Sequence, residues 1–355
     1  MDLQKLSVCV LFGGVSPEHE VSLRSARSVL ENMDAEKYNI FPVGITKDGD
    51  WVLYGGSDYA ALTDGTWQDC EKNRRAAVSP VRGQGLLTFE NDCVVRERID
   101  VVFPVLHGEN GEDGSVQGLM QIAGIPCVGS DVSASAVCMD KTLSKLVAQM
   151  AEIRQAEWLL VTRADFTHDG EAVVALAEGK FAYPVFVKPS GTGSSVGVSC
   201  AHDREELLAA ISEALRFDDK ILIEERIVGQ EVEVAVLGND TIVASICGEI
   251  DSGEGFYDYD AKYVTGTSKL CIPARISDEL SEKTREVAVH AYRAMGCRGL
   301  ARVDFFVTPE GEIVFNEINS IPGFTSISMY PKLFTESGMT YPELIDRLLE
   351  LALET

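Results

Sequence analysis

Three oxygen-bearing side chains near the end of the chain have the types that bind a divalent metal ion. Asp304 lies in one apolar run, and Glu317 and Asn319 lie in the next, across a loop at residues 308–311 that contains Pro and Gly. Such a loop joins two antiparallel strands as a hairpin. Carboxylate and amide oxygens suit Mg²⁺ that is bound jointly with substrate phosphates, and the neighbouring Arg302 suits a phosphoryl group in transfer. The pattern predicts a metal site for phosphoryl chemistry.

The register of this hairpin decides which side chains share a face. Pairing Val307 with Glu312 predicts a polar face, because directly opposed residues project to the same side. That face carries Arg302, Asp304, Glu317 and Asn319. The other face carries Val303, Phe305, Val307, Val314 and Ile318. Phe306, Ile313 and Phe315 share the polar face and cover part of it. Burying two carboxylates together is costly unless a cation compensates, so we favour a metal site over the alternative of a solvated face.

A Gly- and Ser-rich loop directly after Lys188 is the second candidate site. Residues 190–197 contain three glycines and several hydroxyl side chains, so many backbone N–H groups are free to bind an anion such as a phosphate. The loop is not a Walker A motif, since the lysine precedes the glycines, and it lacks the G-x-G-x-x-G spacing. Taken alone, such a segment is more often a flexible hairpin turn.

The third candidate lies at residues 249–268, where glycines flank a dense aromatic and charged run at 256–263. That composition fits a mobile lid that closes over a ligand and excludes water. A loop whose tyrosines pack on a neighbouring domain explains the segment equally well.

Two further motifs follow apolar runs in the first third of the chain. His107 begins a Gly- and acid-rich segment after the run 100–106, and Glu18 follows a Gly-Gly turn after the run 7–12. A His at the carboxyl end of a strand in an open sheet lies where small ligands bind. An acidic surface turn explains the first motif equally well, and a charge beside a helix N-terminus explains the second.

These residues need strands and helices to position them. In the N-terminal part we predict strands at 7–12, 39–45 and 100–106 and helices at 21–32 and 115–123. Ser16 would cap the first helix, with Pro17 as its first residue. This alternation predicts an open parallel α/β sheet. Residues 47–98 have weak periodicity and are interpreted as an insertion of hairpins and loops.

The rest of the chain has an α+β pattern. We predict strands at 183–188, 196–200, 220–224, 231–238 and 241–249, besides the hairpin described above. Helices are predicted at 139–150, 203–215, 277–295 and 341–351. No low-complexity linker separates these segments, so we expect the domains to pack tightly.

The composition is that of an acidic globular protein. The 355 residues include 31 basic and 56 acidic side chains, a net charge of −25. Binding to nucleic acid through bulk charge needs a basic face, so we expect no nucleic-acid partner. Nine scattered cysteines form no C-x-x-C pair and suggest neither disulfides nor a zinc site. We find no signal peptide or membrane helix, and expect a cytoplasmic protein with no membrane contact.

Together these segments resemble the D-alanine–D-alanine ligases of the ATP-grasp superfamily. The resemblance covers nearly the whole chain apart from 47–98. Its six motifs lie at residues 13–23, 107–114, 139–141, 188–197, 256–263 and 316–326. The resemblance implies a three-domain ATP-grasp fold with α/β and α+β parts. The implied domains are an N-terminal α/β domain with an open parallel sheet at 1–132, a central ATP-grasp subdomain at 133–225, and a C-terminal one with metal site and lid at 226–355.

The resemblance implies an enzyme that joins two D-alanines for peptidoglycan precursor synthesis. ATP would convert the first D-alanine to an acyl phosphate, which the amine of the second would attack. The implied cofactors are ATP and two Mg²⁺ ions, with Mn²⁺ as an alternative and a monovalent cation left open. A homodimer is the implied assembly.

The resemblance also assigns roles to individual residues. The catalytic set would be Glu18, His107, Ser194, Tyr263 and Arg302. ATP would be bound by Lys141, Lys188, Ser195, Glu224, Ile227, Glu231 and Lys262. Glu224 and Ile227 would lie against adenine, Glu231 at the ribose, and the lysines at the phosphates. The second D-alanine would lie at Gly323 and Ser328, and the metal ions at Asp304, Glu317 and Asn319.

Some alternatives stay open. Ile327 stands before Ser328 where the family often has His, and Gly191-Thr192 replaces bulkier residues of the phosphate loop. Tyr263 favours the dipeptide ligases over relatives that use D-lactate, but D-serine as the second substrate, as in the resistance-associated D-alanine–D-serine ligases, is compatible with the sequence. Another ATP-grasp ligase would lack the Glu18 and Tyr263 motifs. A non-catalytic nucleotide-binding module would not need the metal ligands and the arginine.

Overall fold

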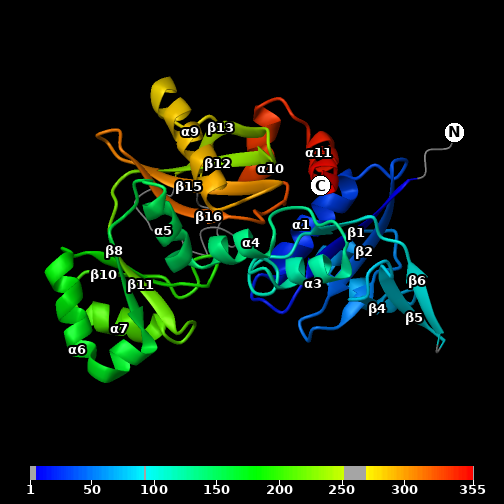
Figure 1. Ribbon diagram of the computed structural model, residues 1–355, viewed down its shortest axis with the longest axis horizontal. Coiled ribbons are helices and arrows are strands. Elements are labelled where there is room, and N and C mark those ends of the chain that lie inside the picture. The colour runs from blue at the N-terminus through cyan, green and yellow to red at the C-terminus, as the bar shows by residue number, and fades with distance from the viewer. Residues whose placement is uncertain (1–4, 92, 252–268, 355) are drawn as a thin grey trace.

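The computed structural model describes residues 5–91, 93–251 and 269–354, which form three sheets. Figure 1 shows these sheets in three lobes, with the N-terminal sheet at one end, a small middle sheet at the other, and the C-terminal sheet beside both. Two core clusters lie within the N-terminal and middle lobes, and two others involve the C-terminal sheet.

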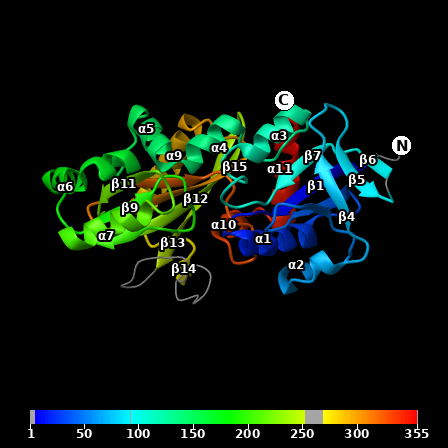
Figure 2. The ribbon, with the colours of Figure 1, turned by 90° about the horizontal axis from the view of Figure 1, so that it is seen from below.

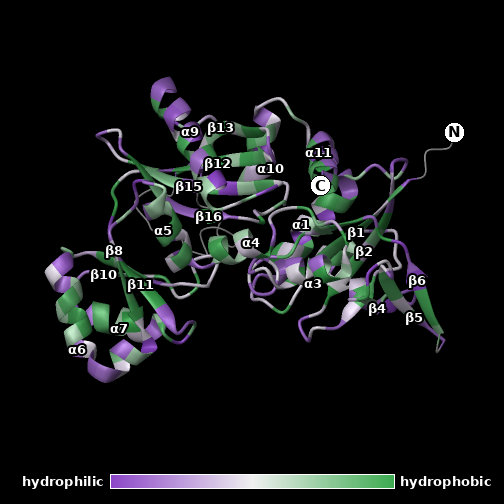
Figure 3. Ribbon diagram, viewed as in Figure 1, coloured by the Kyte–Doolittle hydropathy of each residue, from purple (hydrophilic) through white to green (hydrophobic). Residues whose placement is uncertain are grey.

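The N-terminal sheet is parallel at its centre, as predicted. Its parallel part consists of β1 (Leu6–Gly13), β2 (Tyr38–Ile45) and β7 (Val101–Pro104), with helices α1 (His19–Asn32) and α3 (Ser115–Ala123). The insertion adds β3 (Trp51–Leu53), α2 (Ala61–Asp64), η1 (Trp67–Asp69), β4 (Arg74–Val78), β5 (Leu86–Glu90) and β6 (Cys93–Glu97). Its strands extend the sheet in antiparallel order, β6-β5-β4-β3-β2-β1-β7. Hydrophobic residues are concentrated on β1 and β2 (Figure 3).

The predicted start of the first helix is wrong. The helix begins at His19 rather than at Pro17, and Glu18 is its N-cap residue. The Ser16 hydroxyl accepts a hydrogen bond from the Glu18 N–H at 3.1 Å and donates one to the His107 carbonyl at 2.6 Å. Ser16 therefore stabilises a turn before the helix, and this turn joins the two motifs that follow β1 and β7.

The middle sheet has the order β10-β9-β11-β8 and contains the predicted hairpin around the Gly-Ser loop. Its strands are β8 (Trp158–Thr162), β9 (Val185–Pro189), β10 (Ser199–Ala201) and β11 (Lys220–Glu225). Helices α6 (Arg163–Lys180) and α7 (Arg204–Ala214) cover the outer face of this sheet (Figure 1). The sequence did not lead us to predict β8 or α6.

The C-terminal sheet has the order β14-β13-β12-β15-β16. Its strands are β12 (Gln230–Gly238), β13 (Ile242–Asp251), β14 (Lys269–Cys271), β15 (Leu300–Val307) and β16 (Ile313–Asn319). The helices of this half are α4 (Val132–Met139), α5 (Lys141–Met150), α9 (Asp278–Ala294), α10 (Met329–Glu336) and α11 (Tyr341–Leu353). Asp140 caps α5 as the predicted helix start requires, accepting hydrogen bonds from Thr142 and Leu143.

Helix α11 packs on the N-terminal sheet although it lies at the other end of the chain, as Figure 2 shows. Leu344, Ile345 and Leu348 are fully buried in one cluster with residues of β1 and β7. The Tyr38 hydroxyl and the Lys37 amino group each lie 2.6 Å from the Asp346 carboxylate. One face of the N-terminal sheet is therefore closed by the last helix.

The predicted hairpin forms, but its register differs from the prediction. Val307 pairs with Ile313 rather than with Glu312, and a β-bulge at Asn316 interrupts the ladder. Because two residues of β16 then oppose one of β15, the faces are exchanged beyond the bulge. Asp304 opposes Glu317 directly, so the predicted polar face is retained.

The shifted pairing changes the predicted faces of three apolar residues that precede the bulge. Phe315 pairs with Phe305, and their rings pack in the core 6.2 Å apart between centroids. Ile313 also packs against this core, whereas Val314 opposes Phe306. Phe315 and Ile313 therefore lie on the apolar face, and Val314 lies on the other.

Within the described ranges, none of the helices combines the length and the apolar character that crossing a membrane requires. The domain boundaries predicted at 132 and 225 stay predictions.

Candidate active site

The polar face of the β15–β16 hairpin is held together by Arg302. Its Nε and Nη2 donate to the two Asp304 oxygens at 2.7 and 2.6 Å, and Nε lies 3.1 Å from Glu233 Oε2 on β12. The Asn319 amide donates to Asp304 Oδ2 at 3.1 Å. Burial disfavours the charge of Arg302, but the Asp304 and Glu233 carboxylates outweigh it and hold the pKa of Arg302 well above its ordinary value. We did not predict Glu233, whose place opposite Asp304 follows only from the β12–β15 register.

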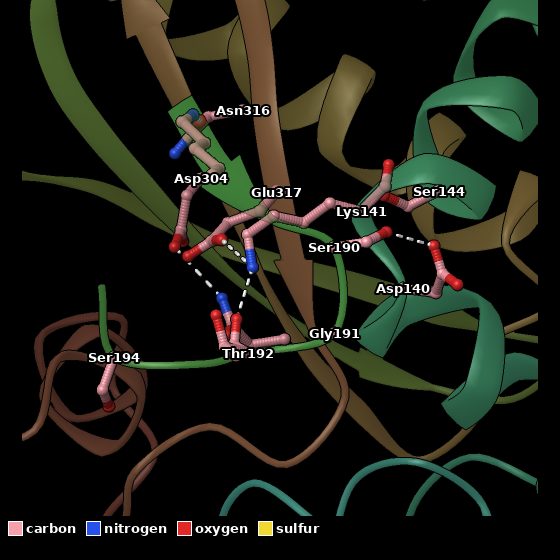
Figure 4. A network of polar contacts seen from close by, with 12 residues as sticks. Asp140, Lys141, Ser144, Ser190, Gly191, Thr192, Ser194, Asp304, Asn316 and Glu317 are labelled. Carbon is pink, nitrogen blue, oxygen red and sulfur yellow. Dashed lines mark hydrogen bonds and ion pairs between the residues drawn. The ribbon is translucent and has the colours of Figure 1, made fainter. Parts of the chain in front are cut away.

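Two lysines from other elements approach this face. Lys141 Nζ, at the start of α5, donates to the Thr192 carbonyl at 2.6 Å and lies 3.8 Å from Glu317 Oε2. Figure 4 shows this amino group between the backbone of the Gly-Ser loop and the hairpin. Lys188 Nζ, near the end of β9, donates to Asn316 Oδ1 at 3.3 Å. The bulge residue Asn316 is thus a second site residue that the sequence did not lead us to predict.

The Gly-Ser loop has the backbone of an anion-binding turn. Ser194 and Ser195 have φ of +48° and +59°, and Gly197 has φ of +74°. A turn of this kind leaves backbone N–H groups outside helix and sheet hydrogen bonding, and such groups can bind an anion. The base of the loop is fixed on α5, because Ser190 Oγ donates to Asp140 Oδ1 at 2.6 Å.

The Ser194 hydroxyl joins the loop to the N-terminal lobe by donating to Glu18 Oε1. Glu18 is buried, and a Cβ on Gly193 would lie 3.0 Å from its Oε2. Two segments that the sequence separates by more than 170 residues therefore meet here. Tyr263 and Lys262, which the resemblance assigns to the catalytic and nucleotide-binding sets, lie outside the described residues.

A second buried carboxylate lies beside Glu18. Gly108 has φ of +72°, its N–H donates to Glu112 Oε2 at 2.7 Å, and a Cβ on it would lie 2.5 Å from Glu18 Oε2. Burial, and then the Glu18 charge, raise the pKa of Glu112 to about 8. The His107 ring lies at the same place, with Nε2 3.1 Å from Ser25 Oγ. Burial lowers the pKa of His107. Glu112 belongs to the motif at residues 107–114, but the sequence of an acidic turn does not indicate that this side chain is buried.

The segment predicted for the second substrate adjoins this cluster. The Phe324 N–H donates to Ser25 Oγ at 3.2 Å, the same hydroxyl that contacts His107. Ser328 Oγ accepts from the Thr325 N–H at 3.0 Å, and a Cβ on Gly323 would lie 2.8 Å from it. The absence of a side chain at Gly323 therefore leaves space beside the Ser328 hydroxyl.

The predicted nucleotide residues lie along β11 and β12. Glu224 is buried between Lys188, 2.8 Å from Oε2, and Lys145, 3.2 Å from Oε1. Burial disfavours the carboxylate charge, but the two lysines outweigh it and lower the pKa of Glu224 to about 2. Half-buried Ile227 follows in the connection to β12. Glu231 lies on β12 two residues before Glu233, so both project to the same face as Arg302.

The donor set of the hairpin fits Mg²⁺. Asp304 and Glu317 stand directly opposite each other, and Asn319 contacts Asp304. In the part of the chain that the structure describes, no three His, Cys, Asp or Glu side chains come together as a metal site. Two carboxylates and an amide still supply hard oxygen ligands, and phosphate oxygens complete such a shell in Mg²⁺ sites.

A cavity of about 290 Å³ opens at the carboxyl ends of β1, β2 and β7, where open α/β sheets bind ligands. Its lining includes His107, Gly14 and Leu106. A more open hollow of about 670 Å³ lies between α6 and β11 and contains none of the predicted site residues. The chemistry of the charged residues therefore points to the region between the lobes rather than to the larger hollow.

Comparison with protein-family models gives two matches. A model described as D-ala D-ala ligase N-terminus matches residues 7–130, and one described as D-ala D-ala ligase C-terminus matches residues 147–350.

Curated relatives match over nearly the full chain. The D-alanine–D-alanine ligase of Acetivibrio thermocellus is 51% identical, covering 99% of this chain and 96% of that protein. The D-alanine–D-alanine ligase of Clostridium acetobutylicum is 48% identical, covering 98% of each chain.

Solved structures share the fold. The VanG D-Ala:D-Ser ligase from Enterococcus faecalis has a TM-score of 0.89 and 41% identity, covering 98% of this chain and 100% of that one. The D-alanine–D-alanine ligase from Coxiella burnetii has a TM-score of 0.86 and 34% identity, covering 99% and 95%. The predicted fold, with its N-terminal sheet, is confirmed by these likenesses.

Proposed function

The chain belongs to the D-alanine–D-alanine ligase family, a family of ATP-dependent ligases, and from that premise we propose how it joins two D-alanines. A carboxylate oxygen of the first D-alanine attacks the γ-phosphorus of ATP, and the bond from that phosphorus to the ADP oxygen breaks. The amine of the second D-alanine, having lost a proton, attacks the carbonyl carbon of the acyl phosphate. Phosphate leaves with the electrons of its bond to carbon. The product D-alanyl-D-alanine would enter peptidoglycan precursor synthesis.

The contact between Glu18 and Ser194 is the observation that carries this proposal. It joins a buried acid of the N-terminal lobe to the phosphate loop of the middle lobe. An acyl phosphate forms only where an amino acid and a nucleotide phosphate meet, and proximity of this kind supplies much of the rate. Glu18 would bind the ammonium of the first D-alanine, with His107 beside it, while Ser194 and Ser195 cover the phosphate.

Arg302 would stabilise the charge that develops during both steps. Its guanidinium is half-buried and held by Asp304, so it is oriented before the substrates bind. Preorganised charge of this kind is among the largest contributions to catalysis. Lys141 and Lys188 would bind the ATP phosphates, and Lys262 and Tyr263 would act from the lid.

We propose that Asp304, Glu317 and Asn319 hold two Mg²⁺ ions. Bound there, the metal would offset negative charge on the transferring phosphoryl group. Lys141 and Arg302 now contact the two carboxylates, so we expect these cations to turn toward the phosphates when ATP and metal bind.

D-alanine is favoured over D-serine as the second substrate. The two curated D-alanine–D-alanine ligases described above are 51% and 48% identical to this chain, against 41% for the VanG ligase. Gly323 and Ser328 would bind this substrate, beside the exposed Ile327. A homodimer, cytoplasmic location and activation by a monovalent cation stay predictions.

The test is ATP-dependent phosphate release with D-alanine alone, and again with D-serine or D-lactate added, with the product identified by mass. We expect release with D-alanine alone and the dipeptide as product. A strong preference for D-serine would move the chain to the resistance-type ligases. Absence of release with every D-amino acid would overturn the substrate assignment.

A further inference from the structure

Lys145 is a fully buried cation that the proposed mechanism does not use. It lies on α5 one turn after Lys141, and its side chain is 2% exposed. Its Nζ has no hydrogen-bond partner of suitable geometry among the described residues, but it lies 3.2 Å from Glu224 Oε1. Lysines are almost never fully buried unless paired, because removing the charge from water is costly. The ion pair with Glu224 is therefore the interaction that compensates the cost of burying this lysine.

Glu224 gives one carboxylate oxygen to each of two lysines. Oε1 faces Lys145, and Oε2 lies 2.8 Å from Lys188 Nζ. One lysine would be enough to neutralise this carboxylate. The cluster of these three side chains therefore has one positive charge in excess, which favours binding of an anion beside it.

The two lysines differ in their exposure and in the residues that they contact. Lys188 is 15% exposed and also contacts Asn316 on the hairpin, so it borders the region assigned to the phosphates. Lys145 is buried on α5, and its one ion pair among the described residues is that with Glu224 on β11. When a phosphate draws Lys188 away, Lys145 remains as the counterion of Glu224.

We propose that Lys145 is a positioning residue for the nucleotide. It holds Glu224 as an oriented carboxylate, so that Lys188 can turn to a phosphate while Glu224 accepts a hydrogen bond from the amino group of adenine. This inference rests on the proposed function, in which Glu224 lies against adenine and Lys188 at the phosphates.

The arrangement also makes Lys145 a determinant of base selection, through Glu224. A carboxylate accepts a hydrogen bond from the adenine amino group, but inosine carries a carbonyl oxygen in that place, which a carboxylate repels. Without Lys145, either Glu224 keeps Lys188 from the phosphates or it takes up a proton. In both cases ATP binds more weakly, and in the second the discrimination against inosine triphosphate falls.

The experiment measures steady-state kinetics of the full chain carrying Lys145→Met, which keeps the length of the side chain and removes its charge. We expect KM for ATP to rise about 30-fold, the effect of breaking a buried charge pair, while kcat changes little. The preference for ATP over inosine triphosphate, as a ratio of kcat/KM, should fall about tenfold. Lys180→Met is the matched control, since its ion pair with Glu157 is exposed, and it should leave both quantities unchanged.

A second variant separates positioning from general stability. In Lys145→Met/Glu224→Gln neither charge remains, so the Tm should recover relative to Lys145→Met, and KM for ATP should be no higher than in Glu224→Gln alone. An unchanged KM and an unchanged nucleotide preference in Lys145→Met would overturn the proposal, as would a loss of Tm with no change in either. Lys145→Gln replaces Lys145→Met if the latter does not fold.

The role of Lys145 can be tested even if the proposed function is wrong. If the unaltered chain makes no dipeptide, the ligase proposal fails, and binding of ATP and inosine triphosphate is then measured directly by calorimetry on the unaltered chain and on Lys145→Met. Loss of ATP affinity and of base preference in the variant still supports the role of Lys145. Equal binding in the two proteins contradicts it.

Discussion

Two regions of the molecule bury carboxylates, and they stabilise them in different ways. On the hairpin face, defined by Arg302, Asp304, Glu317 and Asn319, side-chain cations compensate the acids. In the acid cluster, defined by Glu18, Glu112 and His107 around Gly108, the contacts come largely from backbone N–H groups and hydroxyls. No lysine or arginine is within ion-pair distance of Glu18 or Glu112 in the described residues.

The difference separates two kinds of binding site. The hairpin face holds its carboxylates ionised with counterions that can turn to an anionic ligand. The acid cluster retains a proton instead, since burial and the Glu18 charge raise the pKa of Glu112 to about 8. We infer that the acid cluster is suited to a cationic ligand group, such as the ammonium of an amino acid, and the hairpin face to phosphate and metal.

Arg302→Met breaks the hairpin face and has the largest expected effect. Asp304 and Glu233 would lose their shared cation, so we expect stability to fall by about 3–5 kcal/mol. The rate of phosphate release, as kcat/KM, should fall by about 10³-fold because the preorganised charge is lost. Thermal unfolding and the phosphate assay measure both. Arg347→Met, which removes an exposed ion pair, is the control, and activity above one-tenth of normal in Arg302→Met would contradict the role.

Gly108→Ala disturbs the acid cluster without changing a charge. The new Cβ would lie 2.5 Å from Glu18 Oε2 at a φ of +72°, so the carboxylate must move. We expect a cost of about 1–3 kcal/mol from the backbone conformation and a loss of kcat/KM of roughly 10- to 100-fold from the displaced Glu18. Gly65→Ala is a close match, because its φ is +84° with no atom within 4 Å of the new Cβ. Equal activity in these two variants would show that Glu18 tolerates displacement.

Glu112→Gln has the smallest expected effect on stability, and it tests the acid cluster through the pH dependence of unfolding. The pKa of Glu112 is raised, so between pH about 4.5 and 8 the folded protein binds a proton that the unfolded chain has lost. Stability from this group is therefore full below pH 4.5 and is lost as pH rises to about 8. Glutamine resembles the protonated acid, so the variant should change stability by less than about 1 kcal/mol at pH 5 and should flatten this decline.

Denaturant unfolding at several pH values measures this decline. The exposed Glu109→Gln should leave the pH dependence as it is. A decline equally steep in Glu112→Gln would assign it to another group.

The sequence predicted the hairpin face better than its register. The alternation of side chains along one strand was enough to place Arg302 and Asp304 on the same face, whatever the pairing. The predicted pairing was one residue out of register, so Phe315 and Ile313 were assigned to the wrong face, and the bulge at Asn316 has no signature in a single sequence. At Glu317 the error in pairing and the omission of the bulge cancelled, so the predicted face of this residue was right.

Lys145 and Glu112 were missed for a physical reason. Each is a charged residue in a segment that, by pattern, resembles a solvated helix or turn, and only the tertiary structure buries it. Ser16 shows the same limit at short range. Its hydroxyl donates a hydrogen bond to the His107 carbonyl, 91 residues away, and Ser16 is not the N-cap of α1 as predicted.

Helix α11 has a consequence for the order in which the protein is made. The face of the N-terminal sheet that it covers is apolar, and Leu344, Ile345 and Leu348 complete that core. During synthesis on the ribosome these residues emerge more than 200 residues after β7. The part of this face that α11 covers, beside α1, must therefore stay exposed until α11 has been made, and we expect the nascent chain to need a chaperone over that interval.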